Sequence, residues 1–502
     1  MTMEEHLRMP ALRSRVMTAE EAAACIEDGM TVGISGFTRA GDAKVVPMAL
    51  ADRAKALGRP FHINLWTGAS VAEEVDRTLT EAGVVARRLP FQSESTMRDA
   101  INRGDVMYVD QHLSLTVEMI REGTLGHLDV AVIEVVAITE DGYLVPSTSV
   151  GNAPTFAAHA DKIILEWNKR QSPLLEGIHD IYMPHARPNR APIPILSVDS
   201  RIGTPYIPVD PKKIVAIVPT DREDHFVELA PPDADTERIA GHLMDFLSHE
   251  LKRGRLPSPL PPLQSGVGSV ANAVLAGMKD TRFDGLVMYS EVLQDAVFEL
   301  MDAGKLRYAS GCAITVAPHN AKRIMNNLQA YQSRMVLRPQ EISNHPEVIR
   351  RLGVIAMNTA LEVDIYGNVN STHVLGTHIM NGIGGSGDFA RNALLSIFMT
   401  KSTAKGGRIS SIVPMVSHVD HTEHDVDVVV TEQGIADLRG LAPRERVSRI
   451  IEHCAHPMYR EMLWDYVKIA AKYGGHTPHA LEQAFAWHLR YRDVGDMRQD
   501  VT

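Results

Sequence analysis

Short apolar runs alternate with amphipathic stretches along most of this chain, and this alternation limits the folds open to it. Residues 31–36, 63–66, 130–134 and 162–166 are apolar runs with the length of buried strands. Residues 45–57, which follow the glycine turn after the first run, have the spacing of a helix. Strands that alternate with helical stretches are typical of α/β domains with mainly parallel sheets. We therefore predict an α/β fold.

Length and composition bound the number of domains. The chain has 502 residues, 44% of them hydrophobic and 23% charged, which is ordinary for a globular protein with two or three domains. Residues 184–211 are proline-rich and aperiodic, and Pro231 and Pro232 precede a strongly helical stretch at 236–251. A boundary near residues 221–233 predicts an N-terminal domain over 1–225 and a C-terminal domain over 226–502.

Two segments of the second half repeat segments of the first. Residues 263–268, with the helical stretch 270–278 behind them, resemble residues 32–36, and residues 366–372 resemble residues 141–148. One explanation is that glycine turns before polar strands are common. The other is a duplication. A duplication predicts two similar open-sheet α/β domains with the active site at their interface.

Charge and cysteine content exclude several classes of protein. The net charge of −11 and the pI near 6.1 argue against a nucleic-acid or anionic-membrane surface, although a local basic pocket stays possible. Cys25, Cys312 and Cys454 are too few and too widely spaced for a disulfide framework. The N-terminus has no apolar signal core, and no stretch approaches the roughly 18 apolar residues of a membrane span. We predict a cytoplasmic protein.

Glu291 is the first candidate for chemistry. It follows the strand predicted at 285–290 and opens the segment 291–301, whose apolar residues have helical spacing. Open α/β folds bind ligands at the carboxyl ends of their strands. The alternative is structural: Ser290 caps the helix, and Glu291 complements the helix dipole from the first turn.

Two glycine-rich turns add to this picture. Residues 266–270 lie between a strand-like segment and a helix, and residues 382–387 hold four glycines in six positions. Main-chain N–H groups in such turns can hold an anion. Neither turn has the Walker or the GxGxxG spacing, so neither indicates a nucleotide phosphate. With a carboxylate at a strand end, the two turns form the constellation of a nucleophile and oxyanion holes for acyl transfer.

Other polar positions are weaker candidates, each of which is often only a loop or a cap. Glu432 follows the apolar run 427–430, Asn344 lies in the predicted turn 343–346, and Lys405 lies in the basic loop 401–407. The histidines of segment 418–424 do not share one helical face, so we favour a polar cluster over a metal site. Small apolar neighbours indicate that Cys312 is a buried structural thiol.

Taken together, these motifs resemble the acetyl-CoA hydrolase/transferase family of class I CoA-transferases, most closely its succinyl-CoA:acetate branch. The resemblance covers nearly the whole chain, and its most specific motifs are residues 265–268, 289–291, 382–391 and 431–434. It implies two similar α/β domains, the second of which carries a catalytic glutamate, and a homodimer. It also implies coenzyme A as a substrate, acyl-CoA and short-chain carboxylates as partners, and no metal or permanently bound cofactor.

The resemblance also implies a role for each motif residue. Glu291 would attack the acyl-CoA thioester to give an anhydride, which CoA thiolate converts into a glutamyl-CoA thioester; this carboxylate would be ionised already at neutral pH. Val267 and Gly385 would serve the oxyanion holes through their N–H groups, while Asn344 and Glu432 would orient the nucleophile and line the acyl site. The implied CoA contacts are Gly266, Val267, Gly268, Ser269, Val270, Asn368, Gly384, Gly385 and Lys405.

Several functions remain open at this point. The first is transfer of CoA between succinyl-CoA and acetate, or another short-chain acid such as propionate. The second is hydrolysis of acetyl-CoA or a similar acyl-CoA, since exclusion of water depends on how the site closes. The third is a non-catalytic module that binds CoA or a sugar phosphate, and the fourth is a metal-dependent hydrolase built on the histidines of segment 418–424.

Overall fold

The computed structural model describes residues 3–228 and 230–498, which divide into two compact units. The first unit combines the chain up to residue 228 with residues 288–301 and 307–352. The second unit holds residues 230–287, residues 302–306 and the chain from residue 353. Glu291 therefore packs with the N-terminal part of the chain. The predicted domain boundary at 225/226 concerns the linear sequence and stays a prediction.

The first unit is built on a twisted sheet with the order β4-β3-β2-β1-β5-β7-β8. Its neighbouring strands are parallel, except that β6 pairs antiparallel with β5. The strands are β1 (Thr31–Ile34), β2 (Ile63–Trp66), β3 (Val85–Leu89), β4 (Met107–Tyr108), β5 (Val130–Ile138), β6 (Leu144–Pro146), β7 (Lys162–Asn168) and β8 (Ile214–Thr220).

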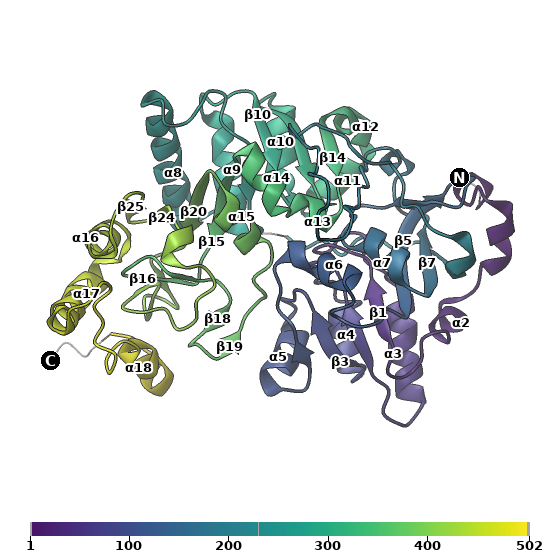
Figure 1. The fold of residues 1–502 in the computed structure, drawn as a ribbon, viewed down its shortest axis with the longest axis horizontal. Helices are drawn as coiled ribbons and strands as arrows, with labels where there is room; N and C mark the ends of the chain where they lie inside the picture. Colours follow the sequence, from purple (N-terminus) through teal and green to yellow (C-terminus); the bar gives the residue numbers. More distant parts are fainter. Residues whose placement is uncertain (1–2, 229, 499–502) are drawn as a thin grey trace. The chain divides into compact units, whose positions relative to one another are not determined.

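Helices connect these strands and pack against the sheet (Figure 1). They are α1 (Met3–His6), α2 (Ala19–Ala23), α3 (Val46–Ala56), α4 (Asp76–Glu81), α5 (Ser95–Arg103), α6 (Leu113–Arg121) and α7 (Ala153–His159). Leu50 of α3 packs with Val32, Val132 and Ile164 of the sheet in one apolar core. Every residue of β5 is buried, as expected for a central strand covered on both faces.

The rest of the first unit carries Glu291. Within it β12 and β14 pair in parallel, as do the short strands β11 and β13. Its elements are β11 (Val292–Leu293), α10 (Asp295–Asp302), β12 (Leu306–Gly311), β13 (Ala313–Ile314), α11 (Pro318–Asn326), α12 (Leu328–Tyr331), β14 (Met335–Leu337), α13 (Gln340–Ser343) and α14 (Pro346–Leu352). The chain enters this part through β10 (Leu286–Tyr289).

In the second unit the strands β9-β15-β20-β24-β25 follow one another in a sheet, and only β25 is antiparallel to its neighbour. They are β9 (Leu263–Ser265), β15 (Ile355–Thr359), β20 (Leu395–Met399), β24 (Val428–Thr431) and β25 (Gly434–Asp437). The helices are α8 (Ala234–Lys252), α9 (Ser269–Gly277), α15 (Ser386–Asn392), α16 (Pro443–Cys454), α17 (Pro457–Ala470) and α18 (Ala486–Val494). Short strands complete the unit: β16 (Glu362–Asp364), β17 (Val369–Asn370), β18 (His373–Val374), β19 (His378–Ile379), β21 (Thr403–Ala404), β22 (Ile409–Ser410) and β23 (Ile412–Val413).

The predicted α/β class with parallel sheets is confirmed, and so are the irregular course of residues 184–210 and the helix α8. The repeated segments also share a local structure. Residues 141–148 and 366–372 each form the turn and second strand of an antiparallel pair, with Gly142 at φ 83° and Gly367 at φ 97°. Among the described residues, no helix is long and apolar enough to cross a membrane.

Candidate active site

Glu291 lies in the bend between β10 and β11, not at the start of a helix. The predicted helix 291–301 is wrong in its first turn, because α10 begins at Asp295. The main chain that precedes α10 pairs with β13 instead. The Glu291 carbonyl accepts the N–H groups of Cys312 (2.6 Å) and Ala313 (3.1 Å). Neither Ser290 as a helix cap nor Glu291 as a first-turn carboxylate therefore describes this segment.

A buried asparagine holds the Glu291 carboxylate. The Asn344 Nδ2 donates to Glu291 Oε1 over 2.9 Å, and the Asn344 side chain is fully buried. Asn344 directly follows the one-turn helix α13, and its main-chain N–H donates to the Gln340 carbonyl at 3.0 Å. The structure thus brings together two of the predicted site residues within the first unit.

The ionisation of Glu291 differs from the expectation of a carboxylate that is fully charged at neutral pH. Burial disfavours the charged form and raises the pKa of Glu291 to about 7, against the opposing effect of the Asn344 hydrogen bond. Near pH 7 the carboxyl is therefore a mixture of both forms. A group at this balance point is typical of functional sites.

Cys312 is a structural thiol, as predicted. Its side chain is fully buried, its Sγ accepts the Gly151 N–H at 3.2 Å, and burial raises the pKa of the thiol well above its ordinary range. A thiol in this state is a poor nucleophile.

The first glycine turn joins β9 to α9 in the second unit. Gly268 caps α9 with φ 129° and ψ 174°, a conformation that essentially only glycine adopts. Val267 is half exposed (50%), and among the described residues no acceptor pairs with its main-chain N–H. The main-chain N–H groups of Val267, Ser269 and Val270, at the start of α9, therefore suit an anion or a developing oxyanion.

The second glycine turn leads into α15. Gly384 has φ 61°, and Gly385 is buried and precedes the first helical residue, Ser386. Ser386 Oγ donates to the Ile383 carbonyl at 2.8 Å, which tightens the turn. The turn places Gly385 directly before the first turn of α15, and its role in an oxyanion hole stays a prediction.

Glu432 lies in the hairpin between β24 and β25, at the predicted strand end. The N–H and the hydroxyl of Ser402 both donate to its carboxylate, the former at 2.8 Å, and Gln433 donates at 2.8 Å. Burial opposes ionisation, but these hydrogen bonds outweigh it and lower the pKa of Glu432. Ser402 was not predicted, because it is a small polar residue in the basic loop 401–407, in which Lys405 was the candidate.

The two weaker CoA candidates occupy turns of the second unit. Both ends of the Asn368 amide have partners within the protein: Nδ2 donates to Asp364 in the same turn, and Oδ1 accepts the N–H of the distant Glu423, both at 3.0 Å. Lys405 is exposed at the tip of the β21–β22 hairpin with φ 52°. The Asn368 amide therefore has a structural role whether or not it also contacts CoA, and the Lys405 side chain is exposed.

The histidines of segment 418–424 form polar contacts rather than a metal-ligand group within the described residues. His418 pairs with Asp420 at 3.3 Å, and His421 contacts Ser386 Oγ at 3.2 Å. Elsewhere, His127, Asp129 and Asp161 could meet around an ion, but they are mainly exposed and Asp129 already accepts the Thr31 N–H.

A buried charge cluster in the first unit escaped the sequence analysis. The Lys44 ammonium contacts Glu134 (2.5 Å) and Asp224 (2.9 Å), with side chains at most 3% exposed. Asp224 also accepts from Thr148 Oγ1 and Gln171, and so fixes the segment that leaves β8. Its residues are far apart in sequence, so no local pattern could have indicated the cluster.

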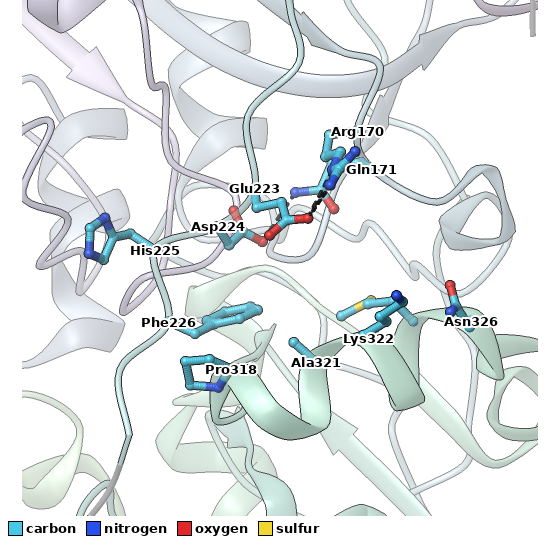
Figure 2. A pocket seen from close by; sticks show the side chains of 11 residues that line it. Arg170, Gln171, Glu223, Asp224, His225, Phe226, Pro318, Ala321, Lys322 and Asn326 are labelled. Atoms are coloured by element: carbon cyan, nitrogen blue, oxygen red, sulfur yellow. Dashed lines mark hydrogen bonds and ion pairs between the residues drawn. The ribbon is translucent and has the colours of Figure 1, made fainter.

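A cavity of about 860 Å³ lies beside this cluster, within the first unit. Figure 2 shows Arg170 and Gln171 on one side, facing Lys322 and Asn326 of α11 on the other. An ion pair of 2.5 Å joins Arg170 to Glu223 in its wall. None of the predicted site residues lines this cavity.

Comparison with known families supports the class of enzyme that the fold and the motifs indicate. The acetyl-CoA hydrolase/transferase N-terminal domain matches residues 4–219, and the acetyl-CoA hydrolase/transferase C-terminal domain matches residues 321–467. The chain therefore belongs to the acetyl-CoA hydrolase/transferase family, and it is an enzyme of this family.

Particular relatives are similar over nearly the whole chain. A succinyl-CoA:acetate CoA-transferase of Clostridium kluyveri is 50% identical over 99% of this chain and 92% of its own length. A propanoyl-CoA:succinate CoA transferase of Escherichia coli K12 is 47% identical over 96% and 98%, respectively. An acetyl-CoA hydrolase of Schizosaccharomyces pombe is 44% identical over 98% and 100%.

Solved structures share the fold at lower identity. RipA from Yersinia pestis matches 91% of this chain and 98% of its own with a TM-score of 0.72 and 22% identity. A 4-hydroxybutyrate CoA-transferase from Porphyromonas gingivalis matches 91% and 98% with a TM-score of 0.64 and 21% identity.

Proposed function

We propose that this enzyme transfers CoA between succinyl-CoA and acetate, with Glu291 as the nucleophile. The observation that carries the proposal is the half-buried Glu291 carboxylate in the bend between β10 and β11, held by the Asn344 amide. The 50% identity to a succinyl-CoA:acetate CoA-transferase supports this pair of acids.

The proposed chemistry is a series of acyl exchanges between the substrate carbonyl and the Glu291 carbonyl. The Glu291 carboxylate attacks the thioester carbon of succinyl-CoA, and CoA thiolate leaves, which gives a succinyl-glutamyl anhydride. The thiolate then attacks the Glu291 carbonyl and releases succinate, which gives the glutamyl-CoA thioester. Acetate attacks the Glu291 carbonyl of this thioester and expels CoA thiolate, which gives an acetyl-glutamyl anhydride. The thiolate then attacks the acetyl carbonyl, which releases acetyl-CoA and the free Glu291 carboxylate.

Main-chain donors are proposed to stabilise the tetrahedral oxyanions of these steps. The Val267 and Gly385 N–H groups are our candidates, and removal of one oxyanion donor typically costs about 3–4 kcal/mol of transition-state stabilisation. Glu432 would line the acyl site, while residues 266–270, Gly384, Lys405 and, less directly, Asn368 would contact CoA. The proposal includes a cytoplasmic homodimer without a permanently bound cofactor.

Hydrolysis is the second candidate, since relatives of this chain bear the name acetyl-CoA hydrolase. Both reactions share the glutamyl-CoA thioester and differ in whether water or a carboxylate attacks it. The test measures loss of succinyl-CoA and formation of acetyl-CoA with and without acetate. Transfer predicts turnover that requires acetate and yields one acetyl-CoA per succinyl-CoA consumed. Equal turnover without any carboxylate would contradict transfer and support hydrolysis.

A further inference from the structure

Tyr289 connects the segment of Glu291 to the segment of Asn344. It is the last residue of β10, two residues before Glu291, and its side chain is fully buried. Its hydroxyl donates to the main-chain carbonyl of Ile342, two residues before Asn344. The same two segments are also joined by the hydrogen bond from Asn344 Nδ2 to Glu291 Oε1. Two parallel bridges therefore link residues 289–291 to residues 342–344.

The position of the Asn344 side chain depends on contacts from other segments of the chain. Its Oδ1 is buried, and no described residue donates a hydrogen bond to it. The hydrogen bond to Glu291 therefore orients the Asn344 amide. The position of this amide depends on the position of the main chain at Asn344. That main chain belongs to the end of α13, which has only four residues. A single helical turn is too short to be stable by its own hydrogen bonds.

Contacts from outside fix α13 at two points. At its start, Gln340 Nε2 donates to the Leu113 carbonyl at 3.0 Å, and Gln340 Oε1 accepts the Ala69 N–H at 3.2 Å. At its end, next to Asn344, the Tyr289 hydroxyl holds the Ile342 carbonyl. Burial raises the pKa of Tyr289 above its ordinary range, so the hydroxyl keeps its proton and can donate.

From this arrangement we infer that Tyr289 is a positioning residue for the nucleophile: its hydroxyl holds the Asn344 amide against the Glu291 carboxylate. The inference rests on the proposed role of Glu291. Tyr289 touches neither the carboxylate nor any substrate atom in this account, and it acts through Asn344.

The test is Tyr289→Phe, which removes only the hydroxyl. We expect kcat to fall about tenfold while the KM values for acyl-CoA and carboxylate change less than twofold, because positioning acts on the reacting geometry and not on substrate affinity. We also expect the acid limb of kcat/KM to move to higher pH, since the Asn344 hydrogen bond favours the charged form of Glu291. The groups that face this carboxylate are the Asn344 amide and the Cys312 thiol, which burial keeps protonated.

Tyr308→Phe is the matched control. Tyr308 lies on β12 in the same unit, and its hydroxyl also donates to a main-chain carbonyl, that of Met335, at 3.3 Å. This variant should keep the wild-type kcat and acid limb. If the loss of a hydroxyl lowered activity only through stability, the loss of kcat in each variant would follow the drop in its melting temperature. The acid limb of kcat/KM would then stay at the wild-type pH.

A double-variant cycle and a direct titration separate this inference from the proposed function. Tyr289→Phe combined with Asn344→Ala should be no slower than Asn344→Ala alone, because Tyr289 acts through the Asn344–Glu291 hydrogen bond, which Asn344→Ala already removes. Infrared difference titration of the Glu291 carboxyl, identified by its absence in Glu291→Gln, should show a higher pKa in Tyr289→Phe without any need for turnover. An unchanged carboxyl pKa, or additive losses in the double variant, would overturn the inference. Failure of the proposed function would instead appear in the wild type, as turnover that does not need acetate.

Discussion

Glu291 combines two demands that oppose each other. A nucleophile must be ionised, while the half-buried setting of the side chain disfavours the charge and raises its pKa to about 7. The Asn344 amide restores part of the lost solvation. A less hydrated carboxylate is also a stronger nucleophile. The raised pKa of Glu291 is therefore consistent with a catalytic role.

The raised pKa predicts the pH dependence of the reaction. Only the carboxylate form can attack the thioester, so kcat/KM for succinyl-CoA should rise with pH and level off above about pH 7. Below that point it should fall about tenfold per pH unit. Initial rates between pH 5 and pH 8.5, with enzyme integrity checked after each assay, give the profile. A flat profile down to pH 5.5 would contradict an attacking group with this pKa.

The same pKa predicts how stability changes in Glu291→Gln. The folded state binds the Glu291 proton more tightly than the unfolded chain, so this contribution to stability is present below the ordinary pKa of 4.5 and is lost as pH rises through about 7. Glutamine keeps the shape without the titration. The variant should match wild type at pH 4.5 and exceed it by about 1–3 kcal/mol at pH 8. Denaturant unfolding at both pH values is the measurement, and a difference that is equal at both would be inconsistent with a raised pKa.

At the scale of elements, the glycine turns before α9 and α15 carry the proposed anion-binding role of the second unit. Gly268 precedes α9 and has φ 129°. A Cβ added there would meet no atom within 4 Å, but the backbone conformation itself is strained for any residue other than glycine. Gly241, inside α8, has equally open surroundings and an ordinary helical conformation.

Gly268→Ala should therefore cost about 1–3 kcal/mol of strain or shift the turn, and with it weaken CoA binding and lower kcat. Gly241→Ala should be neutral or stabilise the protein by up to about 1 kcal/mol. Calorimetric titration with CoA measures the CoA affinity of both variants, and thermal unfolding measures their stability. Wild-type CoA affinity and kcat in Gly268→Ala would mean that this turn is not part of the site.

Elements were predictable from the sequence where local spacing decides them. β2 and the helices α3 and α8 follow from their own residues, because periodic burial and a capping aspartate before α8 are local signals. The first turn of the predicted helix at Glu291 failed because β13, more than 20 residues further on, takes up its main-chain groups. The Asn344–Glu291 bridge spans 53 residues, and only the family resemblance indicated it. The Lys44 cluster had no sequence signal at all.

At the scale of the whole molecule, the Lys44 cluster shows how the first unit tolerates buried charge. One ammonium faces the carboxylates of Glu134 and Asp224, and the nearby Asp42 has its pKa raised by burial. Removal of a single buried partner leaves charges uncompensated, which is far more costly than loss of a surface pair.

Lys44→Met should destabilise the protein by about 3–5 kcal/mol at pH 8. The loss should shrink toward pH 5, because without the Lys44 ammonium burial raises the pKa values of the abandoned carboxylates, which then take up protons. Lys468→Met, which removes an exposed ion pair with Asp465, is the control and should change stability by less than about 1 kcal/mol. Chemical unfolding at both pH values measures the free energy of unfolding. A loss in Lys44→Met that does not depend on pH would argue against buried ionised partners.

The central claim, that Glu291 becomes covalently attached to CoA, is tested most directly by mass. Wild-type enzyme mixed with succinyl-CoA, quenched in acid and digested should yield the peptide of Glu291 enlarged by CoA less one water, and acetate added before the quench should discharge it as acetyl-CoA. Glu291→Gln carried through the same steps should give no adduct. An unmodified Glu291 peptide during active turnover, or an adduct that persists in Glu291→Gln, would contradict the account.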